Sequence, residues 1–181
     1  MHTPSHFLFQ AGFRKYYNTK KNTNIPKSFL VWAIAPDLFL CILVFVYTII
    51  STWWLGNSME FTFRHMFDDL YFHHPFWIFW YNLLHSPTLL AIFILWTRYV
   101  FKKYLGKNYT IVLWFLIWCL VHTAFDIPLH HDDGPRIFYP FSDYRFMSPV
   151  SYWDPTLYGN IVKKIESVLD ILLIVYLLYT P

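Results

Sequence analysis

The chain has 181 residues, of which 56% are hydrophobic, 23% are aromatic and only 14% are charged. Soluble domains usually carry about 25% charged residues, so this composition, with a mean hydropathy of +0.34, favours a membrane protein forming one domain over residues 1–181. The net charge of +3 argues against a nucleic-acid-binding protein, and the two cysteines, both inside apolar runs, argue against a disulfide framework.

Apolar segments recur along the chain. Residues 4–17 suit a short N-terminal helix. Residues 29–55, 76–100 and 109–129 each reach the roughly 20 apolar residues needed to cross a bilayer core. Residues 161–180 are a weaker span, because charged residues crowd their first half. We therefore expect an all-α integral membrane helical bundle of four spans plus a short N-terminal helix.

Region 130–160 breaks this pattern. It contains four prolines and many aromatic residues, and at roughly 30 residues it exceeds ordinary connections. Aromatic side chains in such number argue against disorder. We expect a long, ordered, non-helical loop on the outer side of the membrane.

The charged residues predict the orientation of the spans. Segments 14–27 and 101–108 carry lysines and arginine without acids, whereas segments 56–75 and 127–160 are rich in acids. Basic loops stay in the cytoplasm. We therefore expect the lysine-rich loops inside and the acidic segments outside.

Ionisable residues within the predicted spans are costly to bury and mark a functional site by default. If the basic loops are turns between straight helices, a rise of about 1.5 Å per residue places His6, Asp37, His85 and His122 at a similar depth. Asp126 lies one turn beyond His122 on the same helix face. Imidazoles and carboxylates at one level predict a site for zinc, or for manganese or iron.

Four sequence stretches resemble a known family. "TPSHFLF" at 3–9, "APDLF" at 35–39, "LLHSPTLL" at 83–90 and "VHTAFD" at 121–126 are similar to bacterial membrane-bound, metal-dependent hydrolase-like proteins of the LexA-regulated inner-membrane type. The resemblance implies a bacterial inner-membrane location and the same five metal ligands. The pattern is also similar, more distantly, to zinc-dependent phospholipase C, an all-helical enzyme.

These observations predict a membrane hydrolase that uses a divalent metal, most simply zinc. Its substrate would be an ester or phosphoester at the outer-leaflet side of the membrane, where a lipid could reach the site from the bilayer. One of His130, Asp132 and Asp133 would act as general base, and Arg136 or Arg145 would bind an anionic head group.

Two other functions stay open. His85 and His122 could be the axial ligands of a haem in an electron carrier. Alternatively, the polar layer could only fix helix packing in a non-catalytic scaffold. The sequence does not determine the oligomeric state.

Overall fold

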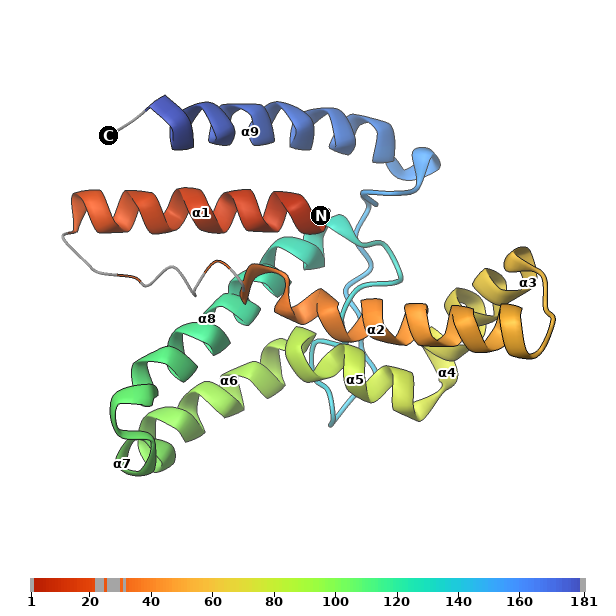
Figure 1. The fold of residues 1–181 in the computed structure, drawn as a ribbon, viewed down its shortest axis with the longest axis horizontal. Coiled ribbons are helices and arrows are strands. Elements are labelled where there is room, and N and C mark those ends of the chain that lie inside the picture. The colour runs from red at the N-terminus through yellow and green to blue at the C-terminus, as the bar shows by residue number, and fades with distance from the viewer. Residues whose placement is uncertain (1, 22–24, 26–29, 31, 180–181) are drawn as a thin grey trace.

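A computed structural model describes residues 2–21, 25, 30 and 32–179, and these are mainly helical (Figure 1). The described part of the chain contains no β-strand, only one isolated bridge between Arg136 and Arg145. The all-α class expected from the sequence is confirmed. Lys27 and the first residue of the predicted 29–55 segment lie outside the described residues.

The helices follow the predicted apolar segments, with shifted ends. The chain runs through α1 (Thr3–Lys20), α2 (Ala35–Ile49), α3 (Met59–Arg64), α4 (Tyr71–His73), α5 (Pro75–His85), α6 (Pro87–Trp96), α7 (Lys102–Leu105), α8 (Tyr109–Asp126) and α9 (Gly159–Tyr179). Turns of π-helix extend α2 over Ile50–Trp54, join α3 to α4 over His65–Leu70 and extend α6 over Thr97–Phe101. Short 3-10 turns occupy Gly106–Asn108, Ile127–Leu129 and Pro155–Leu157.

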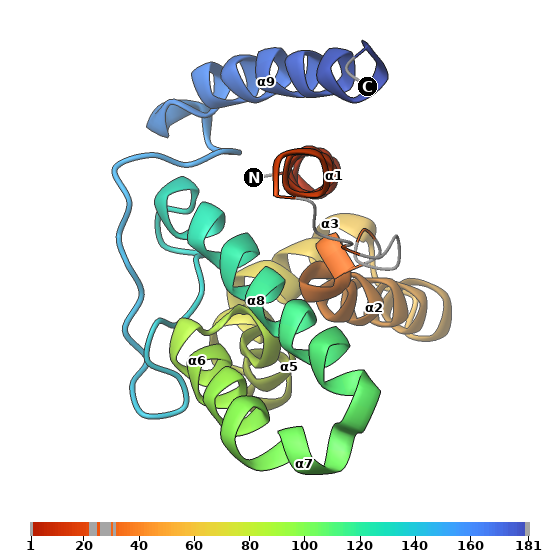
Figure 2. The same ribbon diagram turned by 90° about the vertical axis from the view of Figure 1, so that its left-hand side faces the viewer.

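Three helix pairs build the fold. Helices α2 and α5 pack against each other on one side of the molecule, and α6 and α8 pack against each other on the other side (Figure 1). Helices α1 and α9 form a third, parallel pair that lies over α8 (Figure 2). The two helices come close together at Gly12, because a Cβ there would lie 2.9 Å from Leu173 Cδ2.

The structure corrects the prediction of four spans. Among the described residues, two helices, Ala35–Trp54 and Tyr109–Leu129, are long and apolar enough to cross a membrane. Pro75–His85 and Pro87–Leu105 would form a third candidate if they are taken as one span, but they are bent by 59° relative to each other. Helix α9 does not qualify because its first half carries four charged residues, Lys163, Lys164, Glu166 and Asp170.

Ser86 and Pro87 cause the bend in the predicted 76–100 segment. A residue before proline avoids helical backbone angles, and Ser86 has φ −77° and ψ 118°. Pro87 then begins α6, where its missing N–H costs nothing. The Ser86 side chain accepts a hydrogen bond from Leu89 N at 3.4 Å and caps the new helix.

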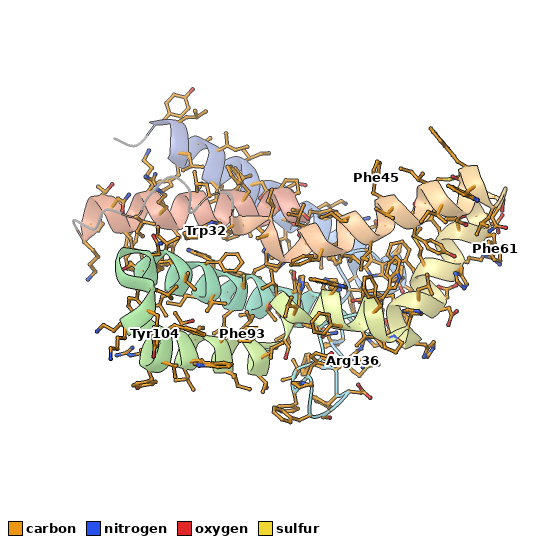
Figure 3. All side chains as sticks on the ribbon, turned by 60° about the horizontal axis from the view of Figure 1, so that its bottom comes forward. Trp32, Phe45, Phe61, Phe93, Tyr104 and Arg136 are labelled. Carbon is orange, nitrogen blue, oxygen red and sulfur yellow. The ribbon has the colours of Figure 1, made fainter. Side chains whose placement is uncertain are left out.

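Buried apolar residues fasten the helices on either side of this bend. Leu84 from α5, Leu90 from α6, and Leu116 and Cys119 from α8 form one cluster. By contrast, α2 exposes much of its apolar surface, and Phe45 points away from the other helices (Figure 3). Trp53 and Trp54 at its end are each 86% exposed. A surface of this kind fits contact with lipid.

Residues 130–154 are irregular, as expected, while α9 already begins at Gly159. The loop is tied to the helix bend, because Thr88 N donates to Ile137 O at 3.2 Å and Ser86 Oγ donates to Tyr139 O at 3.2 Å. It therefore lies beside the point at which α5 ends and α6 begins.

Candidate metal centre

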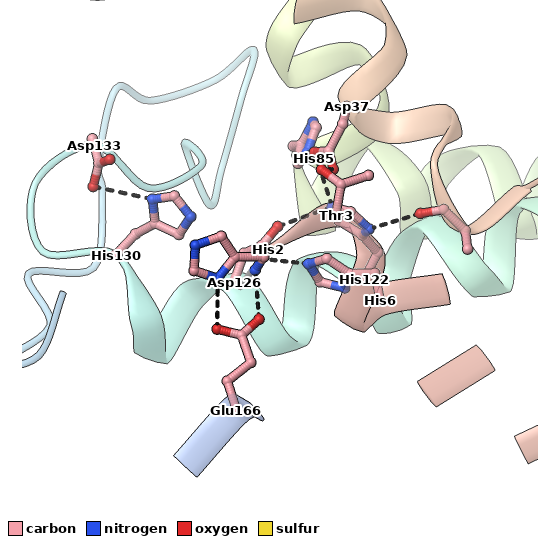
Figure 4. A network of polar contacts seen from close by, with 11 residues as sticks. His2, Thr3, His6, Asp37, His85, His122, Asp126, His130, Asp133 and Glu166 are labelled. Carbon is pink, nitrogen blue, oxygen red and sulfur yellow. Dashed lines mark hydrogen bonds and ion pairs between the residues drawn. The ribbon is translucent and has the colours of Figure 1, made fainter. Parts of the chain in front are cut away.

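His122 and Asp126 form the centre of a buried polar cluster (Figure 4). They lie four residues apart near the end of α8 and therefore share one face of the helix. His122 Nε2 lies 3.0 Å from Asp126 Oδ2, and His6 Nε2 lies 3.0 Å from Asp126 Oδ1. The His6 and His122 rings stack with centroids 3.6 Å apart. Two histidines from different helices thus contact one carboxylate.

Asp37 contacts His122 from the other side and also lies near His85. It lies in the first turn of α2, where the helix dipole favours a negative charge. Its Oδ1 is 3.3 Å from His122 Nε2 and 3.4 Å from His85 Nε2. Its Oδ2 accepts a hydrogen bond of 2.6 Å from Thr3 Oγ1, so α1 helps to orient this carboxylate.

Backbone carbonyls determine the protonation of His85 and His122. His85 Nδ1 is 2.9 Å from Tyr81 O, and His122 Nδ1 is 3.2 Å from Ala33 O. A carbonyl oxygen can only accept a hydrogen bond, so each Nδ1 carries a proton. In the neutral ring the Nε2 atom then presents its lone pair to the carboxylates. A metal-ligating histidine is commonly oriented in this way.

A cation between the imidazole nitrogens and the carboxylate oxygens would turn their repulsive contacts into attractive ones. A nitrogen lone pair facing a carboxylate oxygen at about 3 Å is repulsive unless a proton or metal ion lies between them. His122 Nε2 is buried and has no hydrogen-bond partner, although two carboxylates lie nearby. Helices α5 and α8 also end at the cluster, and helix C-termini favour positive charge. The residues therefore fit a bound divalent ion.

Two overlapping groups of side chains have the spacing of metal ligands. One consists of His6, His122 and Asp126, and the other of Asp37, His85 and His122. Both use His122, whose Nδ1 is already engaged with Ala33 O. One Nε2 atom cannot bind two separate ions, so the two groups cannot both hold an ion with all of their members. All five residues predicted as ligands lie in these groups.

The cluster opens into a cavity of about 700 Å³. Asp37, His85 and Asp126 line its floor, and the predicted catalytic residues His130, Asp132 and Asp133 line its rim. The cavity therefore joins the candidate ligands to the "HHDDG" stretch of the loop.

Asp133 is the best anchored of the rim residues. Its Oδ1 lies 3.1 Å from His130 Nδ1, and its Oδ2 accepts a hydrogen bond of 2.9 Å from Trp153 Nε1. Burial alone would raise the pKa of Asp133, but His130 and Trp153 bring it below its ordinary value. Asp133 is therefore ionised at neutral pH. Asp132 is exposed, and its general-base role stays a prediction, like that of its neighbours.

Arg136 and Arg145 contact the loop itself. Arg136 forms an ion pair with Asp143 and donates to Phe72 O at 3.0 Å. Arg145 donates to Gly134 O at 3.0 Å, and its guanidinium lies over the rings of Tyr71 and Phe72 at 5.4 and 4.9 Å. Neither arginine is among the residues that line the cavity. Their predicted contact with an anionic head group remains untested.

A second polar connection, between α1 and α9, was not expected from the sequence. His2 N and His2 Nδ1 lie 2.7 and 2.8 Å from the two carboxylate oxygens of Glu166. Ser5 Oγ donates to Asp170 Oδ2 at 2.7 Å. The i, i+4 spacing of Glu166 and Asp170 placed both on one face, but only the tertiary structure shows that this face meets α1. His2 also lines the cavity.

Glu166 should make the stability of the protein depend on pH. Burial would raise the pKa of Glu166, but the hydrogen bonds from His2 lower it below its ordinary value. A lowered pKa in the folded state stabilises the protein above the unfolded pKa of about 4.3, and this contribution is lost as pH falls through the folded value. We expect Glu166→Gln to lower the melting temperature at neutral pH.

The difference between wild type and Glu166→Gln should narrow as the pH falls below about 4. Thermal melts of the detergent-solubilised protein at several pH values measure this difference. Glu60→Gln is the control, because Glu60 is exposed and pairs only with Arg64 on its own helix. A constant difference between wild type and Glu166→Gln at every pH would contradict the assignment.

The geometry does not favour a haem between His85 and His122. Both Nε2 atoms lie near the same oxygen of Asp37, and the ring centroids are only 5.2 Å apart. The Asp37 carboxylate therefore lies where the iron and its macrocycle would have to be.

Comparison of the chain with protein-family models, with curated proteins and with solved structures finds no match in any of the three.

Proposed function

We propose that the chain is a membrane-embedded, metal-dependent hydrolase whose ion is held by His6, Asp37, His85, His122 and Asp126. One observation carries the proposal. The buried Nε2 atom of His122 has no hydrogen-bond partner and lies within 3.3 Å of carboxylate oxygens from two different helices. A divalent cation would satisfy the imidazole lone pairs and neutralise both carboxylates.

We propose zinc as the simplest candidate for this ion. Imidazole nitrogens and carboxylate oxygens are common zinc ligands, while manganese and iron accept the same set. A zinc ion bound here would lower the pKa of a coordinated water towards about 7 and polarise an ester or phosphoester group. His130, Asp132 and Asp133 lie at the rim of the adjoining cavity, where one of them could accept a proton from the attacking water.

A lipid-derived substrate follows from the location of the site. The ligand-bearing helices α2 and α8 are the two that are apolar and long enough to span a membrane. The cavity wall also includes Leu40 and Cys41 of α2, next to its exposed apolar surface. The resemblance to bacterial inner-membrane hydrolase-like proteins supports the same proposal, with the lysine-rich segments in the cytoplasm and the cavity facing outwards.

Elemental analysis together with an activity assay tests the proposal. Detergent-purified protein reconstituted with zinc should retain about one ion per chain after removal of free metal, because the ligand groups share His122. The same preparation should hydrolyse p-nitrophenyl esters or phosphoesters, and chelation should abolish this activity. Protein that retains no metal would refute the proposal. Protein that retains metal but has no hydrolytic activity would support a metal-stabilised scaffold.

A further inference from the structure

We infer that the cavity above the metal centre binds a ligand with a positively charged ammonium group. As a substrate assignment this rests on the proposed hydrolase function, but the binding of the cation can be measured separately. The sequence predicted an anionic head group bound by arginines. The ligand inferred from the structure is instead a cation, bound by acids and aromatic rings.

The charges of the cavity wall favour a cation. Five aspartates line the cavity, whereas its lining residues, all of them described, include no lysine or arginine. Asp37 and Asp126 face the candidate metal and would be neutralised by a divalent ion. Three acids remain: Asp68, Asp132 and Asp133. The wall therefore keeps a negative charge when the metal centre is filled, and it would repel a free anionic group.

Aromatic rings complete the same wall. Phe67, Tyr71, Phe72, Tyr81, Tyr152 and Trp153 all line the cavity. An alkylated ammonium ion is attracted to the faces of such rings and is weakly hydrated, so aromatic walls beside carboxylates suit it. Arg145, which does not line the cavity, already makes cation–π contacts with Tyr71 and Phe72. Phe67 and Trp153 are exposed and remain available to a ligand.

The acids are held in place before any ligand arrives. Tyr71 Oη donates to Asp133 O at 2.6 Å, and Trp153 Nε1 donates to Asp133 Oδ2 at 2.9 Å. Asp133 Oδ1 is buried and lies 3.1 Å from His130 Nδ1. Asp133 lines the cavity, so its carboxylate is already positioned where a cationic ligand would bind.

The size and position of the cavity suit a small molecule. Sites for such ligands typically measure about 300–1,000 Å³, and this cavity has about 700 Å³. Its wall joins loop residues to α2 and to the segment between α3 and α4. A lipid head group and a free alkylammonium compound share the same chemistry, and the experiment distinguishes them.

Calorimetric titration of the full-length, detergent-purified protein tests the inference at constant ionic strength. Choline should bind at least about tenfold more tightly than its uncharged carbon isostere dimethylbutanol, because charge and cation–π attraction are lost in the isostere. Inorganic phosphate should bind more weakly than choline. Equal binding of choline and the isostere, or tighter binding of phosphate, would overturn the inference.

Two substitutions in different elements should weaken choline binding. Asp68→Asn and Trp153→Leu should each reduce its affinity by about threefold or more, since each removes one attraction to the cation. Asp69→Asn is the matched control, because Asp69 pairs with His65 and does not line the cavity. Wild-type affinity in both Asp68→Asn and Trp153→Leu would place choline elsewhere.

Two further arms separate the possible outcomes. Short-chain phospholipids with choline or glycerol head groups show whether the ammonium group belongs to a lipid or to a soluble compound. Titrations of zinc-loaded and chelator-treated protein separate this inference from the proposed function. Choline binding by protein that never retains metal would support the ammonium site and refute the hydrolase. Metal retention without a preference for choline would do the reverse.

Discussion

His122→Ala is expected to cause the largest loss of metal affinity of any single substitution. His122 is the one residue that both candidate ligand groups contain. Loss of an outer-shell partner typically weakens metal binding by about 10–100-fold, so loss of this shared ligand should exceed that range. Competition with a fluorescent zinc chelator measures the affinity, and elemental analysis measures the retained metal.

His73→Ala is the matched control, because His73 lies exposed in α4 and belongs to neither candidate group. Thr3→Val gives an intermediate case: it removes the hydrogen bond to Asp37 Oδ2 and leaves all five candidate ligands in place. Its affinity should fall by about tenfold or more. If His122→Ala retains metal as well as wild type does, the candidate centre is not the metal site.

Zinc should strongly stabilise the folded protein. A ligand that binds only the folded state contributes about 4 kcal/mol when its free concentration is about 1,000 times its dissociation constant. For a chain of this size, that corresponds to a rise in melting temperature of roughly 8–16 °C. Zinc should stabilise the folded state because the ion would hold different helices together. The candidate ligands on these helices are His6, Asp37, His85 and Asp126.

Asp126→Asn should remove most of this stabilisation while keeping the shape of the side chain. It takes away a negative charge that contacts both His6 and His122. Asp143→Asn provides the control, since Asp143 is an exposed loop acid outside both ligand groups. Thermal melts of the chelator-treated proteins with and without added zinc make the comparison. Equal zinc-induced shifts in wild type and Asp126→Asn would contradict a role for this carboxylate.

The sequence predicted the five candidate ligands, but the expected geometry that brings them together was partly wrong. We expected straight helices in which the five side chains share one depth. In the structure, Asp37 lies in the first turn of α2 and His85 is the last residue of α5, while His122 and Asp126 lie near the end of α8. The residues meet because helices begin and end at one place. The bend at Ser86 then directs α6 away from α5.

The roles of the loop residues could not be deduced from composition. Arg136 and Arg145 suggested binding of an anion, yet both contact the loop and its neighbours. Glu166 resembled an ordinary surface acid at the start of a helix, yet it is buried against His2. Phe72 O, Gly134 O and His2 each lie more than ten residues from the side chain that they contact, so no local pattern reveals these contacts.

The sequence by itself determined the helical class, the apolar helices and the set of candidate ligands. These depend on local causes: long apolar runs form helices, prolines start them, and a four-residue spacing puts His122 and Asp126 on one face. Only the tertiary structure decided where the apolar helices end or bend, how α1 pairs with α9, and where the acidic, aromatic cavity opens. Those features depend on packing between segments far apart in the chain, and such contacts leave no periodic signal in the sequence.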